Sequence, residues 1–121
     1  MIVAGFGFRG GATLAALRAA LCEAQHGHPR VTAVAAPYDK LALVAALAET
    51  LGLPVIAVSP GALQRADTPT QSIASLAARR AGSVAEASAL AAAGPGAQLR
   101  ATRHISPDRM ATCAIAQGLP A

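Results

Sequence analysis

The chain has 121 residues, which is enough for one domain of ordinary size but not for separate cofactor and substrate domains. Ten Lys and Arg against six Asp and Glu give a net charge of +4, and arginine, whose planar guanidinium suits carboxylates and phosphates, supplies all of the basic residues except Lys40. With no Trp, one Tyr, two Phe and scattered basic residues, the composition argues against a nucleic-acid surface built on base stacking.

Hydropathy and cysteine usage indicate the compartment. The hydrophobic content is 54%, but much of it is alanine, and no uninterrupted apolar run approaches the length of about 18 residues that a membrane span needs. Met1 begins a strand without a charged leader, and the two cysteines lie far apart in sequence, as expected for reduced thiols. We therefore expect a soluble cytoplasmic protein with no membrane partner.

The first half of the chain alternates strands and helices. Apolar runs predict strands over 2–6, 31–36 and 53–58, and leucines at three- and four-residue spacing predict helices over 12–25 and from 41 to 51. The polar loop 26–30 should lie in solvent, and Gly52 with Pro54 should end the second helix. A β-α-β-α-β order implies parallel strands with ligands beyond their carboxyl ends, the edge to which Arg9, Asp39, Lys40 and Ser59 belong.

The second half predicts two further helices and a hairpin. Residues 60–71 are rich in turn formers and predict a mobile loop, and a helix follows over 72–80. Ser83 and Glu86 form a capping box that begins a helix reaching residue 93, and glycines at 94 and 96 end it. Strands over 97–105 and 110–116 should pair around the turn 106–109, with alternate side chains of the first strand on opposite faces. The expected fold is a single α/β domain over 1–121, of three-layer type, with a mixed, mostly parallel sheet of about five strands flanked by helices and a C-terminal β-hairpin.

The glycine cluster after the first strand is typical of an anion-binding turn. Gly7, Gly10 and Gly11 let backbone N–H groups approach a ligand, the following helix offers unpaired donors, and Arg9 adds a full charge. Gly5-x-Gly7-x-x-Gly10 also matches the dinucleotide fingerprint, but that site wants an acidic residue about 20 positions on, whereas Asp39 lies further along and after a proline. A plain tight turn without a ligand is the third interpretation.

The remaining polar motifs have structural interpretations of their own. His26 and His28 could chelate a metal, but no third ligand is near in sequence, so solvated loop histidines are favoured and no metal is expected. Cys22 and Cys113 are interpreted as small buried hydrophobes, and Ser83 as a helix cap whose helix N-terminus can also bind anions. Three polar residues of the first hairpin strand fit a solvated strand face as well as a site: Arg100, Arg103 and His104.

Several segments together resemble the CobE protein of cobalamin biosynthesis and the equivalent C-terminal domain of CbiG. These segments are the start Val3-Ala4-Gly5-Phe6-Gly7-Phe8-Arg9-Gly10-Gly11-Ala12, then Tyr38-Asp39-Lys40, Gly52-Leu53-Pro54, Ser83-Val84-Ala85-Glu86-Ala87-Ser88-Ala89-Leu90 and Ala111-Thr112-Cys113-Ala114-Ile115-Ala116. Their order and spacing cover nearly the whole chain. The resemblance implies a role in corrin-ring assembly, whose intermediates are flat tetrapyrroles fringed by acetate and propionate groups.

Three functions are consistent with this resemblance. The leading one is binding of a precorrin-like intermediate, without a resident cofactor, at a site made of Gly7, Phe8, Arg9, Gly10, Gly11, Asp39, Lys40 and Ser83. The second is hydrolysis of a ring lactone, the reaction with which CbiG-like proteins are linked through an additional N-terminal region; Asp39 or His104 would activate water. The third is a carrier module that docks on another corrin biosynthetic enzyme.

Overall fold

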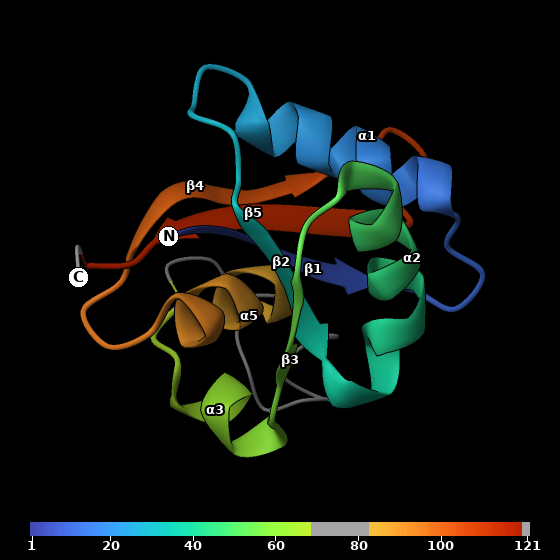
Figure 1. The fold of residues 1–121 in the computed structure, drawn as a ribbon. Helices are drawn as coiled ribbons and strands as arrows, with labels where there is room; N and C mark the ends of the chain where they lie inside the picture. Colours follow the sequence, from blue (N-terminus) through green and yellow to red (C-terminus); the bar gives the residue numbers. More distant parts are fainter. Residues whose placement is uncertain (69–82, 120–121) are drawn as a thin grey trace.

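The strand order organises the molecule. A computed structural model describes residues 1–68 and 83–119, and these form one five-stranded sheet of order β3-β2-β1-β5-β4 (Figure 1). β1 (Ile2–Phe8), β2 (Ala33–Pro37) and β3 (Val55–Val58) are parallel, whereas β4 (Gln98–Ile105) and β5 (Ala111–Gln117) form an antiparallel hairpin whose second strand pairs with β1. The predicted α/β fold with a mixed sheet and a C-terminal hairpin is confirmed.

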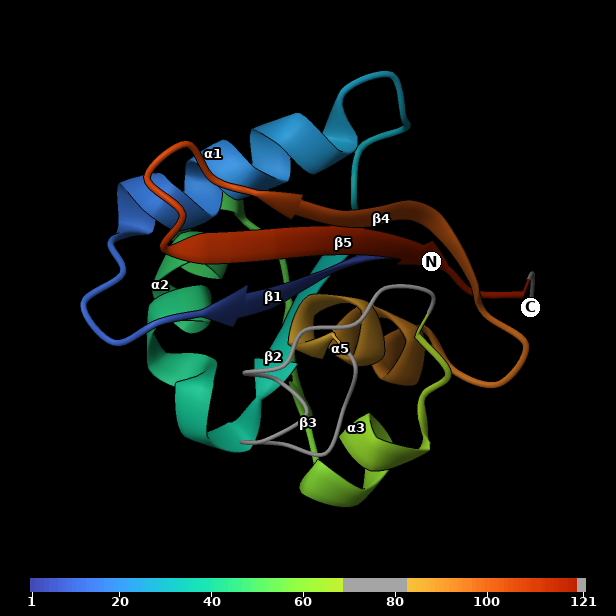
Figure 2. The ribbon, with the colours of Figure 1, turned by 180° about the vertical axis from the view of Figure 1, so that it is seen from behind.

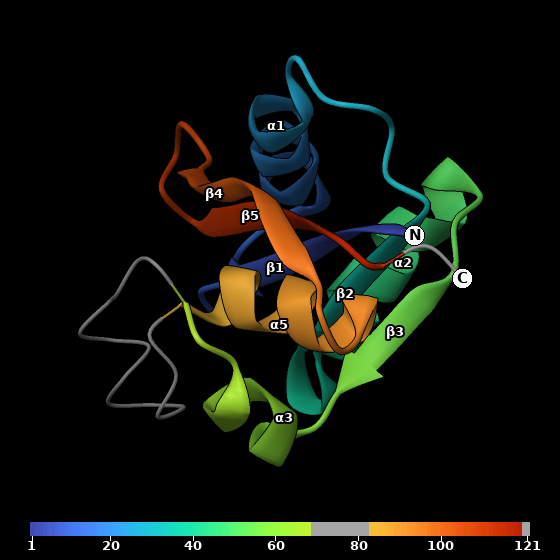
Figure 3. The ribbon, with the colours of Figure 1, turned by 90° about the vertical axis from the view of Figure 1, so that its left-hand side faces the viewer.

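Helices cover both faces of this sheet. α1 (Leu14–Gln25) and α2 (Leu41–Leu51) pack on one face, and α3 (Pro60–Arg65) and α5 (Val84–Ala93) pack on the other (Figures 2 and 3). A short 3-10 turn, η1 (Tyr38–Lys40), joins β2 to α2. The sheet is therefore the middle layer of three, as the sequence predicts.

Each face of the sheet has its own core, because successive strand residues point to opposite sides. Phe6, Leu17, Leu47 and Ile115 are fully buried on the side of α1 and α2. The side of α3 and α5 has a smaller core of which Leu63 is the largest buried residue. Burying one large aliphatic or aromatic side chain contributes about 1.5–3 kcal/mol, so the larger core supplies most of the hydrophobic stabilisation.

Small residues let α5 lie unusually close to β1. A Cβ added at Gly5 would stand 2.2 Å from the Ala85 carbonyl oxygen and 2.4 Å from the Ala89 nitrogen, both backbone atoms of α5. No real side chain fits at such distances. Gly5 of β1 and the alanines Ala85 and Ala89 of α5 thus form a close helix-to-strand contact at the centre of the sheet.

The helix ends follow the predicted chemistry. Gly52 adopts φ 67° after α2, and Gly94 adopts φ 95° after α5, and in both the backbone N–H donates to a carbonyl of the last helical turn. Ser83 precedes α5, and its Oγ accepts the Glu86 N–H at 3.3 Å. These predicted helix boundaries are confirmed within one residue.

The segment after β3 corrects one prediction. Residues 60–65 were expected to be loop, but they form the helix α3. The Ser59 hydroxyl accepts the Ala62 N–H at 3.2 Å, Pro60 occupies the first turn, and Leu63 is 1% exposed in the smaller core. Turn formers here serve as a helix start, because a Ser cap followed by proline is favourable at an N-terminus. The predicted helix 72–80 lies outside the described residues, as does the end of the predicted loop.

Two further predictions need correction. The two-residue alternation expected along β4 is interrupted by register shifts between Leu99 and Ala101 and between Ala101 and His104, since each extra residue of a bulge reverses the faces that follow. Cys22, expected to be buried, is exposed on the outer side of α1, whereas Cys113 is buried as predicted. The apolar neighbours of Cys22 in sequence belong to the opposite side of the helix.

Candidate anion-binding edge

The candidate site lies where the three parallel strands end, after Phe8, Pro37 and Val58. The turn that follows β1 closes through the Ala12 N–H, which donates to the Arg9 carbonyl at 3.1 Å. Gly11 adopts φ 87° in this turn, a conformation that favours glycine. The Arg9 side chain is exposed, so the turn presents a guanidinium at the carboxyl edge of the sheet.

A cation–π contact joins this turn to the end of the neighbouring strand. The Lys40 Nζ lies 5.4 Å from the centroid of the Phe8 ring, and Phe8 also packs against the larger core. Such a contact contributes about 0.5–1 kcal/mol at an exposed site. The structure therefore brings Phe8, Arg9 and Lys40 together, three of the residues that the sequence predicts. Asp39 is exposed one position before Lys40.

The β4–β5 turn lies at the same edge. The Arg9 N–H donates to the Met110 carbonyl at 2.9 Å, which continues the β1–β5 pairing by one residue beyond the strands. In this turn one carboxylate oxygen, Asp108 Oδ1, accepts the Ser106 hydroxyl at 2.6 Å and the Met110 N–H at 3.0 Å. These hydrogen bonds, the Ser106 bond foremost, hold the pKa of the Asp108 carboxyl below its usual value.

Charge at this edge is predominantly positive. Arg9 and Arg109 are exposed and Lys40 is partly exposed, and none of these three side chains forms an ion pair in the part of the chain that the structure describes. Two carboxylates share the edge: Asp108 is hydrogen-bonded within its own turn, and Asp39 also has an interaction partner. Three cations from three separate turns thus face solvent without neutralisation, which favours a ligand with several acidic groups.

On the side of β1 that faces α5, atoms of the protein itself fill the space next to Gly5 and Gly7, so these two glycines have no room for a ligand. A Cβ at Gly7 would lie 3.0 Å from Thr112 Oγ1 and 3.2 Å from the Val84 Cβ, and the Gly7 carbonyl accepts the Thr112 hydroxyl at 3.2 Å. Gly5 and Gly7 are therefore required by packing against the protein itself and not by a pyrophosphate. At Gly10, by contrast, nothing lies within 4 Å of the added Cβ. The dinucleotide interpretation is not supported by this geometry.

The start of α5 supplies a buried polar cluster behind the edge. Ser83 is 2% exposed and Glu86 is fully buried, and Glu86 Oε2 accepts the Arg103 N–H at 3.0 Å, near the second bulge of β4. The carboxylate therefore anchors the hairpin to α5. Ser83 is brought to the carboxyl edge through its neighbour Val84, which packs at Gly7, but its own hydroxyl is used as a helix cap.

Sequence reasoning missed two residues of this region. Thr13 caps α1, with its Oγ1 accepting the Ala16 N–H at 3.2 Å, so one of the helix donors expected to face an anion is already satisfied. Arg109 stands at the tip of the hairpin turn and has φ 61°, the one positive φ at a residue other than glycine in the described ranges. The sequence contained one signal for Arg109. Glycine is favoured after Pro-Asp in a turn, and this chain has arginine at that position.

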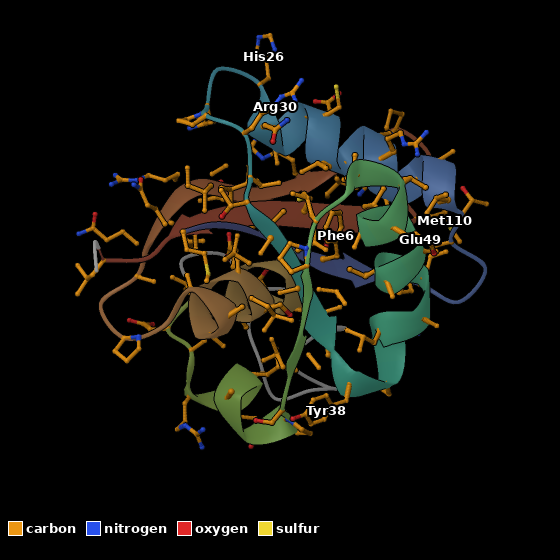
Figure 4. The ribbon with its side chains drawn as sticks, in the orientation of Figure 1. Phe6, His26, Arg30, Tyr38, Glu49 and Met110 are labelled. Carbon is orange, nitrogen blue, oxygen red and sulfur yellow. The ribbon has the colours of Figure 1, made fainter. Side chains whose placement is uncertain are left out.

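The other motifs lie at the opposite end of the molecule. Figure 4 shows His26 and Arg30 on the loop after α1, pointing away from the sheet, and residues 26–30 are all exposed as predicted. An open depression of about 340 Å³ lies on the outer side of α1, lined by Ala19, Cys22, Glu23 and His26. In residues 1–68 and 83–119, no group of three or more His, Cys, Asp or Glu side chains could hold a metal ion.

Comparison with known proteins identifies the family. Residues 2–116 match the family model described as cobalamin synthesis G C-terminus. The chain belongs to this family. The chain is also similar to the crystal structure of CobE, a protein from the cobalamin (vitamin B12) biosynthetic pathway, with 30% identity, a TM-score of 0.86, and coverage of 98% of this chain and 91% of CobE.

A second solved structure gives the same result. The cobalamin biosynthesis protein chiG from Agrobacterium tumefaciens str. C58 is 34% identical, with a TM-score of 0.73 and coverage of 99% of this chain and all of that one. No curated protein matches the chain significantly. The expected resemblance is therefore confirmed at the level of the family, which is a family of cobalamin biosynthesis. Among the helices that the structure describes, none has the length and apolar character needed to cross a bilayer.

Proposed function

We propose that this protein binds a carboxylate-rich, precorrin-like tetrapyrrole at the carboxyl edge of its parallel strands. The observation that carries the proposal is the pair of cations Arg9 and Lys40, which follow two neighbouring parallel strands and form no ion pair in residues 1–68 and 83–119. A tetrapyrrole of this class has acidic groups around its rim, so separated cations suit it better than a single deep anion pocket.

The energetics are adequate for such a ligand. One charge-assisted hydrogen bond contributes about 1.5–3 kcal/mol, and a micromolar complex requires about 8 kcal/mol. A few such contacts, together with partial burial of a large flat ring, reach that value. Tyr38, just before Asp39, is 61% exposed, and its aromatic ring offers an apolar surface after the end of β2 (Figure 4).

The proposed setting is a cytoplasmic step of corrin assembly. Cys22 and Cys113 are both free thiols, which suits a reducing compartment. The partners would be the tetrapyrrole and the enzymes that make or consume it, and neither nucleic acid nor a membrane has a role.

The test is a titration of the purified protein with a porphyrin that carries acetate and propionate side chains, such as uroporphyrin, followed by absorbance and fluorescence. Wild-type protein should shift the pigment spectrum, and the affinity should fall as salt rises. Arg9→Ala should weaken binding about tenfold, because one decade corresponds to about 1.4 kcal/mol.

The control is Arg30→Ala, which removes another exposed arginine from the loop at the far end of the molecule. This variant should bind as the wild type does. A pigment spectrum that the wild-type protein leaves unchanged at every salt concentration would reject the proposed function. Equal weakening by both substitutions would show that binding follows net charge and not this edge.

A further inference from the structure

The β4–β5 turn contains a residue whose backbone conformation is unfavourable for its type. Arg109 has φ 61°, in the left-handed region that L-residues other than Gly, Asn and Asp seldom adopt. The Arg109 N–H donates to the Ser106 carbonyl at 2.8 Å. The strained residue therefore lies within a hydrogen-bonded turn. Glycine would fit this position at lower cost.

The surrounding contacts hold this conformation firmly. Ser106 is 2% exposed, its N–H donates to the Ala111 carbonyl at 2.8 Å, and its hydroxyl both receives the Ala111 N–H and donates to Asp108. Asp108 in turn accepts the Met110 N–H. Strained residues persist where neighbouring structure fixes them in this way, and they gather at ligand sites.

The side chain of Arg109 does nothing for the fold that would explain its presence. It is exposed, and within residues 1–68 and 83–119 the Arg109 side chain forms no hydrogen bond, ion pair or ring contact. Its turn is hydrogen-bonded to the turn after β1, through the Arg9 N–H and the Met110 carbonyl. Two guanidinium groups without a shared carboxylate are therefore presented from adjacent turns.

We propose that Arg109 is a ligand-binding residue, which together with Arg9 engages acidic groups of the bound molecule. This inference rests on the proposed function and deepens it, since it assigns the β4–β5 turn to the site. Arginine at this position gives up backbone stability, and contact with a carboxylate of the ligand compensates for that loss.

The test compares stability and binding in the same variants. Arg109→Gly relieves the positive φ and removes the charge, so its thermal midpoint should equal or exceed that of the wild type, while its affinity for uroporphyrin should fall about tenfold. Arg109→Lys keeps the charge and should recover part of the affinity. Arg30→Ala again serves as the control and should change neither property.

The outcomes separate this inference from the proposed function. If the wild type binds uroporphyrin and Arg9→Ala weakens binding while Arg109→Gly does not, the inference about Arg109 is wrong and the site without it stands. If the wild type does not bind the pigment, both fail. A second probe, a porphyrin with only two carboxylates such as deuteroporphyrin, should bind more weakly to the wild type and show a smaller effect of Arg109→Gly.

Discussion

At the scale of single residues, the four glycines at the start of the chain have different physical roles although they form one motif. At Gly5 a side chain would collide with α5, at Gly7 it would be crowded by Thr112 and Val84, and Gly11 is needed for its positive φ. Gly10 has open space and no positive φ. The sequence motif resembles a single phosphate-binding loop, but two of its glycines are needed for packing, one for its backbone conformation, and one for neither.

This difference predicts unequal effects of alanine. Gly5→Ala should lower the free energy of unfolding by about 3 kcal/mol, because the new methyl group would force α5 away from β1. Gly10→Ala is the matched control and should leave stability unchanged or raise it by about 0.5 kcal/mol, since alanine reduces the entropy of the unfolded chain. Urea denaturation measures both. Equal effects at the two positions would contradict the close contact between β1 and α5.

At the scale of elements, the hairpin is held by carboxylates as well as by strand pairing. Glu86 reaches from α5 to the Arg103 N–H, and Asp108 fastens the turn through Ser106 and Met110. Each satisfies backbone or hydroxyl groups that the irregular β4–β5 ladder leaves without strand partners. These contacts fix the position of the turn relative to Arg9.

The Asp108 contact predicts a pH dependence of stability. Because the hydrogen bond from Ser106 holds the pKa of Asp108 in the folded protein below its ordinary value of 3.8, the ionised carboxylate stabilises the fold above that pH, and this contribution is lost as the pH falls through the folded-state pKa. Asp108→Asn keeps the shape without the charge. Its stability deficit relative to the wild type, measured by urea denaturation, should therefore be largest near neutral pH and disappear at pH values well below 3.8. A deficit that stays constant over this range would contradict the assignment.

The elements also show what sequence patterns can and cannot predict. Leucine spacing and glycine stops located α1, α2 and α5, because these signals are local to each helix. The bulges of β4 and the bond from Glu86 to Arg103 depend on residues distant in sequence, and no local period reveals them. In the same way, the placement of Arg9 and Lys40 at the carboxyl edge was predictable from the rule for parallel strand ends, whereas Arg109 reaches this edge only because the fold inserts β5 beside β1.

At the scale of the whole molecule, one sheet is shared by both cores. β1 contributes Phe6 to the larger core and Val3 to the smaller core. Loss of one core would therefore disturb the other. Cooperative, all-or-none unfolding is the expected behaviour of a domain built in this way.

The two thiols test this cooperativity. Cys113 is fully buried, and burial raises the pKa of its thiol, whereas Cys22 is exposed. In a Cys22→Ala variant, labelling of Cys113 by a thiol reagent should begin at the same guanidinium concentration as the loss of helical circular dichroism. Labelling of Cys113 at lower denaturant, with helix content intact, would show that the hairpin opens separately from the rest of the sheet.

The central place of β1 also bears on synthesis. Its Ile2 pairs with Gln117 and its Val3 with Ala116, contacts between opposite ends of the described chain. Within this domain, β1 therefore waits for the distant strand β5 before its second edge is covered, and such long-range pairing slows folding. Until β5 has been synthesised, one apolar edge of β1 stays open to other polypeptides, chaperones among them.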